Sequence, residues 1–424
     1  MTPSLPIKAR NMWQKIRQLP RNIWVLTIAS FLTDVSSDMI VHLIPLFLAN
    51  VLGVRTVTIG LIEGVAETTA SLLKVGSGRL SDWLGQRKWL TVSGYALSTI
   101  VKPFLVVANS WQTVLSVRFF ERMGKGIRTA PRDALIADSI TPDKRGLAFG
   151  LHRAGDTAGA ALGLLIALIV IWLLQGRELT LARQTFHTLV WVSVIPAFLA
   201  VVVLAIGIRE VKTADTAQKR HERIRTPLPP LFKRFLIVVV LFTLGNSSDA
   251  FLILRAQERG VSILGVMGML LVFNIVYAAV SGPAGSLSDK VGRRRFLIIG
   301  WLFYALIYLG LALAQTGGQI VGLVIVYGIY YGLTVGTAKS FVADLVPATQ
   351  RGTAYGWYNG AVGLAALPAS VLAGLLWQGI GEWPGWGANA PFFFGAIVAL
   401  AATGLLVLWL PDRVSGQRTG KIVP

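Results

Sequence analysis

Long apolar runs separated by short polar segments dominate this chain of 424 residues. The runs 296–314, 319–338 and 392–410 contain no acidic or basic residue. An α-helix needs about 20 such residues to cross a bilayer. We therefore predict membrane-spanning helices in twelve ranges, at 23–50, 57–80, 88–108, 111–138, 147–173, 187–208, 234–256, 262–288, 296–314, 319–345, 353–377 and 390–410.

Composition places the chain among membrane proteins. Hydrophobic residues make up 54% and charged residues 14%, which is outside the usual balance of a soluble protein. The absence of cysteine excludes disulfides, thiol chemistry and cysteine-based metal sites. The basic segment up to Arg21 lacks an apolar core followed by a small-residue cleavage site, so we do not expect a cleaved signal peptide.

The placement of the basic residues explains the net charge of +20. If both termini lie on one side, the segments on that side contain 25 lysines and arginines, whereas the opposite loops contain only Arg55, Arg177, Arg183 and Arg259. Cytoplasmic loops carry such an excess, so both termini are predicted to be cytoplasmic. The basic residues therefore indicate topology and contact with anionic membrane lipids, and nucleic acid is not expected as a partner.

The second half of the chain repeats the first. The stretch GRLSDWLGQRKWL at 78–90 returns 207 positions later as GSLSDKVGRRRFL, and FLTDVSSDMI from Phe31 returns as FTLGNSSDAF from Phe242. RGLAFG from Arg145 returns as RGTAYG from Arg351. Such repeats predict two similar six-helix bundles in parallel orientation. The predicted fold is an all-α integral membrane protein with twelve transmembrane helices, arranged as a bundle at 1–208, a charged cytoplasmic linker at 209–233 and a second bundle with a short tail at 234–424.

The repeated pattern Gly-x-Leu-Ser-Asp-x-x-Gly-x-Arg resembles the loop signature of the major facilitator superfamily, a large group of secondary transporters. It follows the second and eighth predicted helices, as it does in that family. The resemblance implies alternating access between two halves, with substrate near mid-membrane. It also implies close helix contact at the first glycine of each copy, a cytoplasmic charge network at each aspartate, and anchoring by the bases that follow. The residues marked as gating or structural are Gly78, Asp82, Gly85, Arg87, Gly285, Asp289, Gly292 and Arg294.

Each loop copy has two interpretations. An aspartate at a helix end beside Arg87 or Arg294 can form an ion pair that closes one face and breaks when the halves rock. The alternative is a simple loop anchor. The fourth predicted helix also resembles the arginine-containing helix that this family links to proton coupling, but its spacing differs, because Arg118 lies six and Arg122 two residues before Gly124.

Several predicted helices carry charges far from water, which is costly and marks function by default. In the range 111–138 they recur at three- and four-residue intervals and so form one stripe along a helix face. This stripe consists of Arg118, Glu121, Arg122, Lys125, Arg128, Arg132 and Asp133. The other deep charges are Asp34, Asp38, Glu63, Glu67, Lys74, Lys102, Arg153 and Asp156 in the first half and Asp249, Arg255 and Lys339 in the second. In the first half eight bases accompany seven acids, so one interpretation is that they form internal ion pairs.

The other interpretation is substrate and proton binding. Acids concentrate on the first two helices and bases on the fourth, so protonation of a carboxylate would release a base for an anion. A carboxyl group removed from water also binds a proton more readily. We predict proton coupling at Asp38 and Glu67, which lie closest to mid-span, and then at Glu63. The predicted substrate-binding residues are Arg118, Arg122, Lys125, Arg128, Asp34 and Asp249, the last being the repeat equivalent of Asp38 with structural hydrogen bonding as its alternative.

The fifth predicted helix offers two features with plain alternatives. His152 could relay protons or simply be hydrogen-bonded within the bundle. The spacing of Gly155, Gly159 and Gly163 lets helices pack tightly. Drug antiporters of the superfamily usually carry a Gly-Pro pair in this helix, and this chain has none there, which argues against drug efflux.

The remaining patterns exclude other function classes. GTAKS, ending at Ser340, has alanine before its lysine and lies inside a predicted helix, so it is no nucleotide-binding loop. No HExxH pattern occurs, and we expect no catalytic residue, metal or cofactor. We predict a monomeric, proton-coupled secondary transporter of the bacterial inner membrane for a small polar, anionic organic solute or chelate. The alternatives are a drug efflux antiporter, motivated by aromatic residues around Trp301, Tyr304 and Tyr327, and a non-transporting membrane sensor or assembly partner.

Overall fold

The computed structural model describes residues 18–84, 86–141, 144–211, 227–347 and 350–411. Of Arg79, Asp82, Gly146 and Ser286 it describes the backbone alone. Regular structure in these ranges is helical, apart from one antiparallel bridge between Ile380 and Trp383. The all-α prediction is therefore confirmed for the part that the structure covers.

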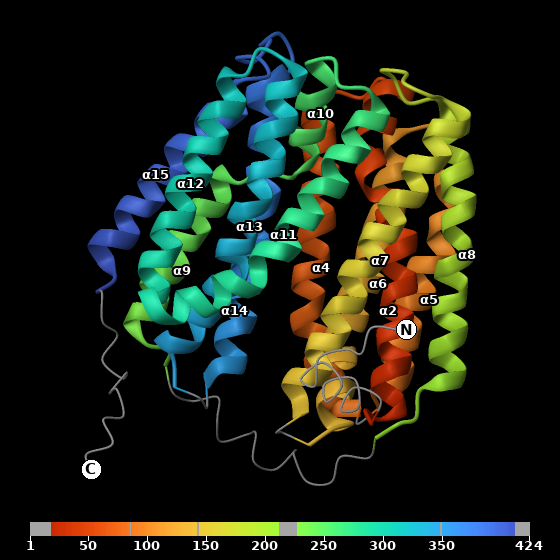
Figure 1. Cartoon of the computed structure of the whole chain (residues 1–424), viewed down its shortest axis with the longest axis vertical. Coiled ribbons are helices and arrows are strands. Elements are labelled where there is room, and N and C mark those ends of the chain that lie inside the picture. The colour runs from red at the N-terminus through yellow and green to blue at the C-terminus, as the bar shows by residue number, and fades with distance from the viewer. Residues whose placement is uncertain (1–17, 85, 142–143, 212–226, 348–349, 412–424) are drawn as a thin grey trace, which may run out of the picture. The chain divides into compact units, whose positions relative to one another are not determined.

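Most helices follow one another with short connections (Figure 1), whereas residues 208–229 separate α8 from α9. The first elements are α2 (Arg21–Asp38), the 3-10 turn η1 (Val41–Leu43), α3 (Ile44–Leu46), the π-helical turn η2 (Phe47–Val51), α4 (Thr56–Leu84), α5 (Lys88–Val101), the 3-10 turn η3 (Lys102–Leu105), α6 (Trp111–Asp138), α7 (Arg145–Leu174) and α8 (Arg183–Gly207). The later elements are α9 (Pro230–Gly245), α10 (Ala250–Glu258), α11 (Ile263–Val291), α12 (Arg293–Leu313), α13 (Gly317–Leu345), α14 (Arg351–Gln378) and α15 (Ala390–Trp409).

Within the described ranges, nine helical segments are long and apolar enough to cross a membrane. They begin at Arg21 (through α2 to η2), Leu147, Arg183, Pro230 (through α9 and α10), Ile263, Arg293, Gly317, Arg351 and Ala390. The helices α4, α5 and α6 are not among them. Helix α5 has only 14 residues before η3 continues it, and α4 and α6 carry deep charges. The protein is thus a multi-pass integral membrane protein, and twelve spans stay a prediction.

Contacts divide the chain into two compact units. Unit 1 covers Met1–Phe47, Leu72–Gly176 and Leu181–Gln218, and unit 2 covers Leu48–Ser71, Arg177–Thr180 and Lys219–Pro424. The first part of α4 joins unit 2 because it packs closely on α14. A Cβ added to Gly64 would lie 2.7 Å from the Cα of Leu367, and one added to Gly374 would lie 2.5 Å from the Cα of Val57. The predicted linker at 209–233 lies largely outside the described residues.

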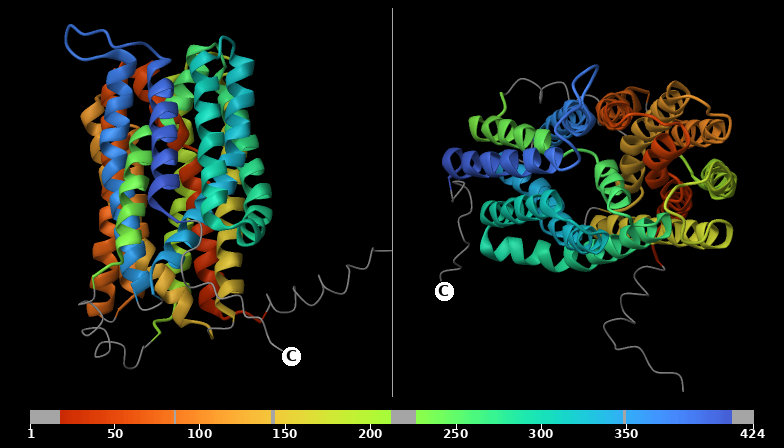
Figure 2. Two further views of the ribbon diagram at one scale, coloured as in Figure 1. Left: turned by 90° about the vertical axis from the view of Figure 1, so that its left-hand side faces the viewer. Right: turned by 90° about the horizontal axis from the view of Figure 1, so that it is seen from above.

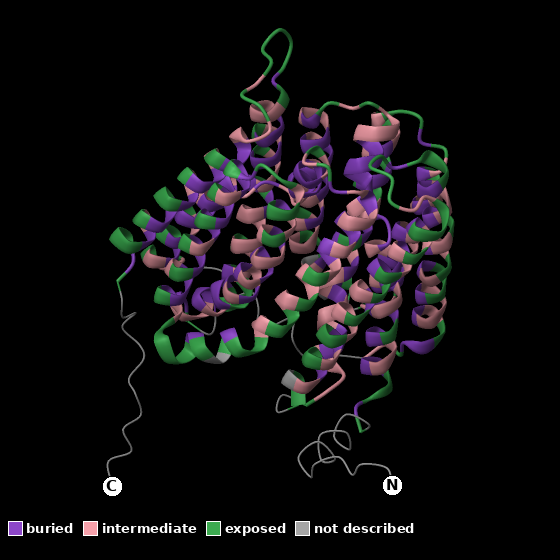
Figure 3. Ribbon diagram, turned by 45° about the horizontal axis from the view of Figure 1, so that its top comes forward, coloured by how far each residue is buried: buried purple, intermediate pink, exposed green. Residues whose placement is uncertain are grey.

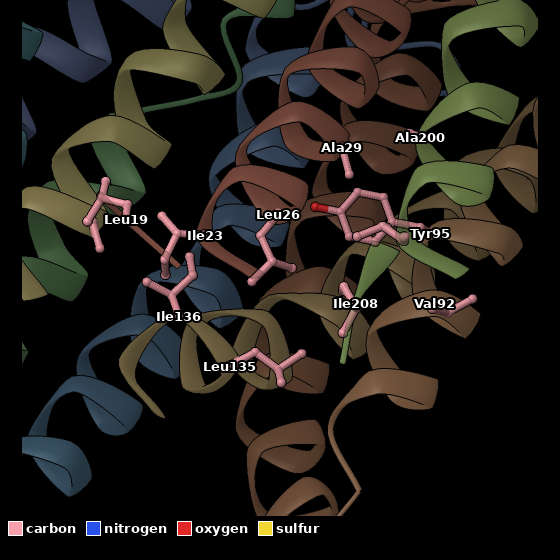
Figure 4. Packing of buried hydrophobic residues seen from close by; sticks show 12 residues of the cluster. Leu19, Ile23, Leu26, Ala29, Val92, Tyr95, Leu135, Ile136, Ala200 and Ile208 are labelled. Atoms are coloured by element: carbon pink, nitrogen blue, oxygen red, sulfur yellow. The ribbon is translucent and has the colours of Figure 1, made fainter. Parts of the chain in front are cut away.

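In unit 1, α2 packs against α7 and α8, and α5 packs against α6. A buried apolar cluster joins α2, α5, α6 and α8, with Leu26, Ala29 and Tyr95 among its members (Figure 4). Glycines permit the close approach of α7 to α2: a Cβ added to Gly163 would lie 2.5 Å from the carbonyl oxygen of Val35, and Gly159 meets Phe31 in the same way. The predicted tight packing of this helix is confirmed.

In unit 2, α12 lies between α13 and α15, and α9 packs along α15 (Figure 2). Its interior is filled by aromatic rings: Tyr304, Tyr308 and Tyr327 are fully buried. Buried and exposed residues alternate around most helices, so that these present one covered and one open side (Figure 3), whereas α10 is buried from Ala250 to Ala256. Large exposed apolar residues such as Ile397 and Leu408 on α15 suit contact with lipid tails.

Candidate functional site

The charged stripe of α6 begins with a buried ion pair. Ser110 caps the helix, its hydroxyl accepting a hydrogen bond from the amide of Thr113. Arg118, 0% exposed, donates from Nη1 to Oε2 of Glu121 at 3.0 Å. Residues three positions apart are neighbours on a helix, so the sequence spacing alone brings these two together. A guanidinium buried so deeply needs such a partner, which supports the interpretation of internal ion pairs.

Arg128 is likewise buried and bound to its own chain. Its Nη1 donates to Oγ of Ser98 at 3.0 Å, and its Cζ lies 4.2 Å from the ring centroid of Tyr95. Both partners come from α5, which approaches α6 closely because glycines face each other. A Cβ added to Gly124 would lie 2.5 Å from the carbonyl oxygen of Gly94. Two of the four bases predicted to bind substrate are therefore engaged by neighbouring side chains.

Arg122 and Lys125 differ from those two arginines in their accessibility. Lys125 is exposed and Arg122 is partly buried, although both lie between Arg118 and Arg128 on the same helix. Of the four bases predicted to bind substrate, the two in the middle of the stripe are thus the accessible ones. A base that is both deep in the bundle and accessible can meet a soluble anion, whereas a buried and paired one cannot.

The predicted acids of α2 lie where that helix ends. Asp38 is the last residue of α2, and its Oδ1 lies 3.3 Å from Nε2 of His42. Asp34, one turn earlier, is partly buried, as is Asp38. On the facing helix α6, Arg132 donates to Oγ of Ser30 at 3.3 Å. The structure therefore brings both acids of α2 and the bases of α6 into unit 1.

A buried lysine, Lys102, lies at the start of η3 in the same unit. Lys102, 4% exposed, donates to Oγ of Ser36, which in turn donates to the carbonyl oxygen of Ser193 at 2.6 Å. A small pocket beside it is apolar apart from Ser37, Lys102 and Glu121. Its charged lining belongs to the same network of unit 1.

The predicted acids of α4 fall in unit 2. Glu63 is buried and Glu67 is partly buried. The helix that carries them is fixed to α14, where the hydroxyl of Thr68 donates to the carbonyl oxygen of Gly363 at 2.6 Å. The boundaries of the sequence repeat place these acids in the first half of the chain. The glycines of α4 and α14, which allow the two helices to pack closely, were a signal that the sequence analysis did not use.

The aspartate of the second SSD copy lies at a break in a helix. Helix α9 ends at Gly245, α10 begins at Ala250, and Asp249 stands at its amino-terminal boundary. Oδ2 of Asp249 accepts a hydrogen bond from the hydroxyl of Tyr331 at 3.1 Å. The hydroxyl of Tyr304 donates to the carbonyl oxygen of Gly245 at 3.0 Å. Tyr304 thus satisfies a backbone carbonyl at the break, as backbone inside a membrane requires, whereas Tyr331 satisfies the side chain of Asp249.

The aromatic side chains of unit 2 form a packed core rather than an open wall. The rings of Tyr304 and Tyr308 stack at 4.0 Å between centroids, and those of Phe242 and Trp301 stack at 4.3 Å. All four are buried. Tyr331, at the edge of this cluster, is partly buried. Burial takes most of these rings away from any ligand, so they do not support the drug-efflux prediction that they motivated.

The first loop copy anchors the end of α4 and the start of α5. Arg87 forms an ion pair with Asp138 at the end of α6. The amides of Arg87 and Lys88 donate to the two carboxylate oxygens of Glu210 at 3.0 and 2.8 Å. Burial lowers the pKa of Arg87, and the Glu210 carboxylate acts in the opposite direction. A Cβ added to Gly78 would lie 3.4 Å from the Cβ of Ala130 of α6. The side chain of Asp82 and the whole of Gly85 lie outside the described residues.

The second copy forms a similar cluster, but with a different arginine than the one that we predicted. Asp289 pairs with Arg293 at 2.9 Å, and Arg293 also pairs with Asp344 of α13 at 2.5 Å. Arg294 instead donates to the carbonyl oxygen of Val407 at 2.8 Å. Gly292 ends α11 between Asp289 and Arg293 and has a φ of 101°, so this pair forms across the turn that joins α11 to α12.

Two glycines of this copy have different surroundings. Gly292 has a φ of 101°, which only glycine adopts readily, and it separates α11 from α12. A Cβ added to Gly285 would meet no described atom within 4 Å. The close helix contact that the resemblance implies at Gly285 is therefore not present in the described part of unit 2.

Sequence reasoning missed the acids that complete both loops. The signal was available, because Arg87 and Arg293 are 206 positions apart, and so are Asp138 and Asp344. An ion pair conserved in both copies of the repeat was thus visible as two matched spacings. The position in the second half of the repeat that is equivalent to Glu210 lies outside the described residues.

Comparison with known proteins gives one family over almost the whole chain. A family model described as Major Facilitator Superfamily matches residues 26–271 and 235–422. An uncharacterized MFS-type transporter from Methanocaldococcus jannaschii is 37% identical over 401 residues, covering 93% of this chain and 96% of that protein. A probable 4-methylmuconolactone transporter from Cupriavidus pinatubonensis is 27% identical, covering 85% and 83%.

A multi-drug resistance efflux pump from Streptococcus pneumoniae is 24% identical to the chain, covering 77% of it and 82% of the pump. Among solved structures, a nucleoside transporter superposes with a TM-score of 0.76 at 12% identity, covering 92% of this chain and all of that one. This likeness concerns the fold, since the identity is low.

Proposed function

The chain belongs to the major facilitator superfamily and is not an enzyme, and from that premise we propose that it is a proton-driven secondary transporter of a small organic anion. We place it in a bacterial inner membrane, as a monomer of twelve spans with cytoplasmic termini, in two bundles joined by the linker at 209–233. The transport cycle would alternate access to a site near mid-membrane, as repeats of this kind do.

The observation that carries the anion proposal is the uneven burial along α6. Arg118 and Arg128 are covered and paired within unit 1, whereas Lys125 is exposed and Arg122 is partly buried. Arginine and lysine bind carboxylate and phosphate through charge-assisted hydrogen bonds. We therefore assign Arg122 and Lys125 as the anion ligands. We give Arg128 the role of fixing α6 on α5 and Arg118 that of pairing with Glu121 within α6.

The proton proposal rests on acids carried by α2 and α4. Asp38 next to His42 at the end of α2, and Glu67 and Glu63 on α4, are the proposed proton sites. Asp34 and Asp249 are proposed to contact the substrate. A small carboxylate suits this arrangement, and the 4-methylmuconolactone named for one relative is an acid of that size.

Thermal unfolding of the purified full-length protein tests the substrate class. The panel would contain 4-methylmuconolactone, benzoate, citrate, inorganic phosphate and the lipophilic cation tetraphenylphosphonium. A ligand that binds only the folded state stabilises it by about 2.7 kcal/mol at a hundred times its dissociation constant. We expect at least one organic anion to raise the melting temperature. Stabilisation by tetraphenylphosphonium alone would contradict the anion proposal and favour efflux of lipophilic cations, the activity class of the multi-drug relative.

Variants in α6 sharpen this test. In Lys125→Gln and Arg122→Gln the stabilising anion should bind about tenfold to a hundredfold more weakly, because each loses a charged hydrogen bond worth about 1.5 to 3 kcal/mol. Lys144→Gln, an exposed lysine between α6 and α7, is the matched control and should bind like the parent protein. Equal loss in all three would indicate a general charge effect instead of a site.

Transport in proteoliposomes tests the coupling. With the stabilising anion as the probe, an inward proton gradient should drive its accumulation in the parent protein. Asp38→Asn and Glu67→Gln should lose accumulation and keep anion exchange. If both variants still accumulate the anion fully, their assignment is wrong. If no anion of the panel moves in the parent protein, a non-transporting sensor or assembly role becomes the better explanation.

A further inference from the structure

Helix α7 contains a buried histidine and aspartate that none of the roles above uses. His152 is 4% exposed, and its Nε2 lies 3.8 Å from Oδ1 of Asp156. This distance is too long for a hydrogen bond. Among the residues that the structure describes, neither ring nitrogen of His152 and not Oδ1 of Asp156 has a hydrogen-bond partner.

Such a pair is unusual in a folded protein. The large majority of buried polar side-chain atoms have at least one hydrogen-bond partner, and a histidine that only fills space would be expected to have one too. Here three buried polar atoms of two neighbouring side chains are without a protein partner at the same point of one helix. The pair therefore carries a cost that a purely structural role does not explain.

The charged groups around the pair come from each helix that packs against α7. From α6, Arg132 and Asp133 act on His152, and on α7 itself Arg153 and Asp156 do so. From α2, the charge of Asp34 acts repulsively on that of Asp156. The ionisable groups of α8 are Arg183 and His187 in its first turns, at the opposite end of α7 from His152, because the two helices are joined by the short segment 175–182.

Two features decide what this pair can bind. It is too covered for an organic solute, so its ligand must need almost no room. Two repelling carboxylates on facing helices gain from one added positive charge. We propose that His152 and Asp156 form a proton-binding pair of unit 1, coupled to Asp34 on α2. This inference rests on the proposed proton-driven transport and adds a site to it.

The proton step is simple to balance. The neutral imidazole of His152 accepts one proton at Nε2 from a hydronium ion and becomes an imidazolium: an N–H bond forms, an O–H bond breaks, and a water molecule leaves. The imidazolium then donates toward Oδ1 of Asp156, and its positive charge reduces the repulsion between Asp156 and Asp34. Release of the proton restores that repulsion. Because α7 packs on α2 through glycines such as Gly159, a change in this charge balance acts directly on the contact between the two helices.

Histidine-selective NMR tests proton binding without any substrate. The chain contains four histidines, so ring-labelled protein in nanodiscs gives few signals, and the His152 signal is the one lost in His152→Gln. We expect this signal to titrate between about pH 4 and 9, around the range where histidines charge. Its midpoint should move by about one pH unit in Asp156→Asn, which corresponds to a tenfold change in proton affinity. His187 is the internal control, whose signal should not respond to Asp156→Asn.

Transport of the anion identified above gives the second readout. We expect proton-driven accumulation to fall about tenfold in His152→Gln and in Asp156→Asn, the change that a shift of one pH unit in proton affinity would produce. Anion exchange should stay within twofold of the parent protein. His187→Gln should behave like the parent protein. Thermal unfolding of each variant would verify folding, and His152→Asn provides a second substitution if His152→Gln is unstable.

The outcomes separate this inference from the proposed function. A His152 signal that does not titrate over this range, or that titrates without responding to Asp156→Asn, overturns the pair. Full proton-driven accumulation in both variants overturns it as well. If the parent protein moves no anion but the NMR signal titrates and responds to Asp156→Asn, the proposed function fails and the proton-binding pair stands.

Discussion

Helices α6 and α13 occupy equivalent places in the two halves of the repeat. Their comparison shows which structural features the two halves share and which side chains differ. Ser110 and Thr316, which cap them, are 206 positions apart, and so are Asp138 and Asp344 near their ends. Between these matched ends the interior faces differ. Glu121 and Lys125 of α6 correspond to Tyr327 and Tyr331 of α13 at the same offset.

The contacts of the two helices show the same division. Gly94 of α5 meets Arg128 of α6, and Gly300 of α12 meets Thr334 of α13 at the same offset. The helix pairs therefore pack alike in both units. Unit 1 fills the adjoining space with ion pairs and unit 2 fills it with stacked tyrosines. The close packing of these helix pairs determines the shared architecture. The side chains beside the packing contacts differ between the two units, and they determine what each unit can bind.

The strongest test of this contrast replaces a charge of unit 1 with its counterpart in unit 2. Arg118 corresponds to Val324, and Arg118→Val leaves the carboxylate of Glu121 without its 3.0 Å partner. We expect a loss of about 3 to 5 kcal/mol in the free energy of unfolding, as for other buried pairs that lose one member. Chemical denaturation in mixed micelles measures it.

The double variant Arg118→Val with Glu121→Gln supplies the control, since it removes both charges. It should recover most of the loss, because an absent pair costs much less than a broken one. If the single and double variants are equally unstable, the packing of the arginine stem matters more than its charge.

Glycine contacts should give the next largest effect, and a similar one in both units. Gly163→Ala in α7 places a Cβ 2.5 Å from the carbonyl oxygen of Val35, and Gly328→Ala in α13 places one 2.7 Å from that of Phe273. Backbone must move in each case, so we expect about 1 to 3 kcal/mol of destabilisation. Thermal and denaturant unfolding check it.

The same substitution at open positions of the same units is the control. A Cβ added to Gly150 of α7 or Gly268 of α11 meets no described atom within 4 Å. Alanine there should be neutral or stabilising, because it lowers the entropy of the unfolded chain. Destabilisation at Gly150 equal to that at Gly163 would show that helix packing is not the cause.

Much of this architecture was readable from the sequence. Apolar period and length predicted an all-α membrane protein, and the repeat with its loop pattern predicted the family, which the family model and the relative from Methanocaldococcus jannaschii confirm. These features are local or strictly periodic. The charged helices α4 and α6 mark the limit, because periodicity placed their acids and bases without giving their partners.

The partners were harder to predict because they depend on which helices approach. Spacing within one helix gave Arg118 with Glu121, but it did not give Arg128 with Ser98 on α5. The partner of Asp289 is Arg293 and not the neighbouring Arg294 that we predicted, so this prediction was wrong by one residue. The tyrosines motivated the drug-efflux prediction because sequence alone does not distinguish a buried ring from an exposed one.

The loop clusters should show a smaller effect. Asp138→Asn removes the partner of Arg87, and Asp344→Asn removes one of the two carboxylates that bind Arg293. These side chains are only partly covered, so we expect about 1 kcal/mol or less for each, falling further in high salt. Unfolding at low and high ionic strength measures both.

The two units should respond unequally to these asparagine variants. In unit 2, Asp289 still pairs with Arg293 after the change. The Arg87–Asp138 pair is also the more covered of the two, with side chains 13% and 19% exposed against 24% and 23% for Arg293 and Asp344. The larger loss should therefore occur in Asp138→Asn. The opposite order would show that the two loop copies differ in more than their residues.

Effects of similar size should come from single tyrosine hydroxyls at the break between α9 and α10. Tyr304→Phe removes the donor to the carbonyl oxygen of Gly245, and Tyr331→Phe removes the donor to Asp249. Each hydrogen bond is worth about 0.5 to 1.5 kcal/mol of unfolding free energy. Their difference is more informative than their size. If Asp249 contacts substrate, Tyr331→Phe should change the affinity for the stabilising anion, while Tyr304→Phe, deep in the packed core, should change stability alone. Equal anion affinity in both variants would confine the substrate site to the charged interior of unit 1.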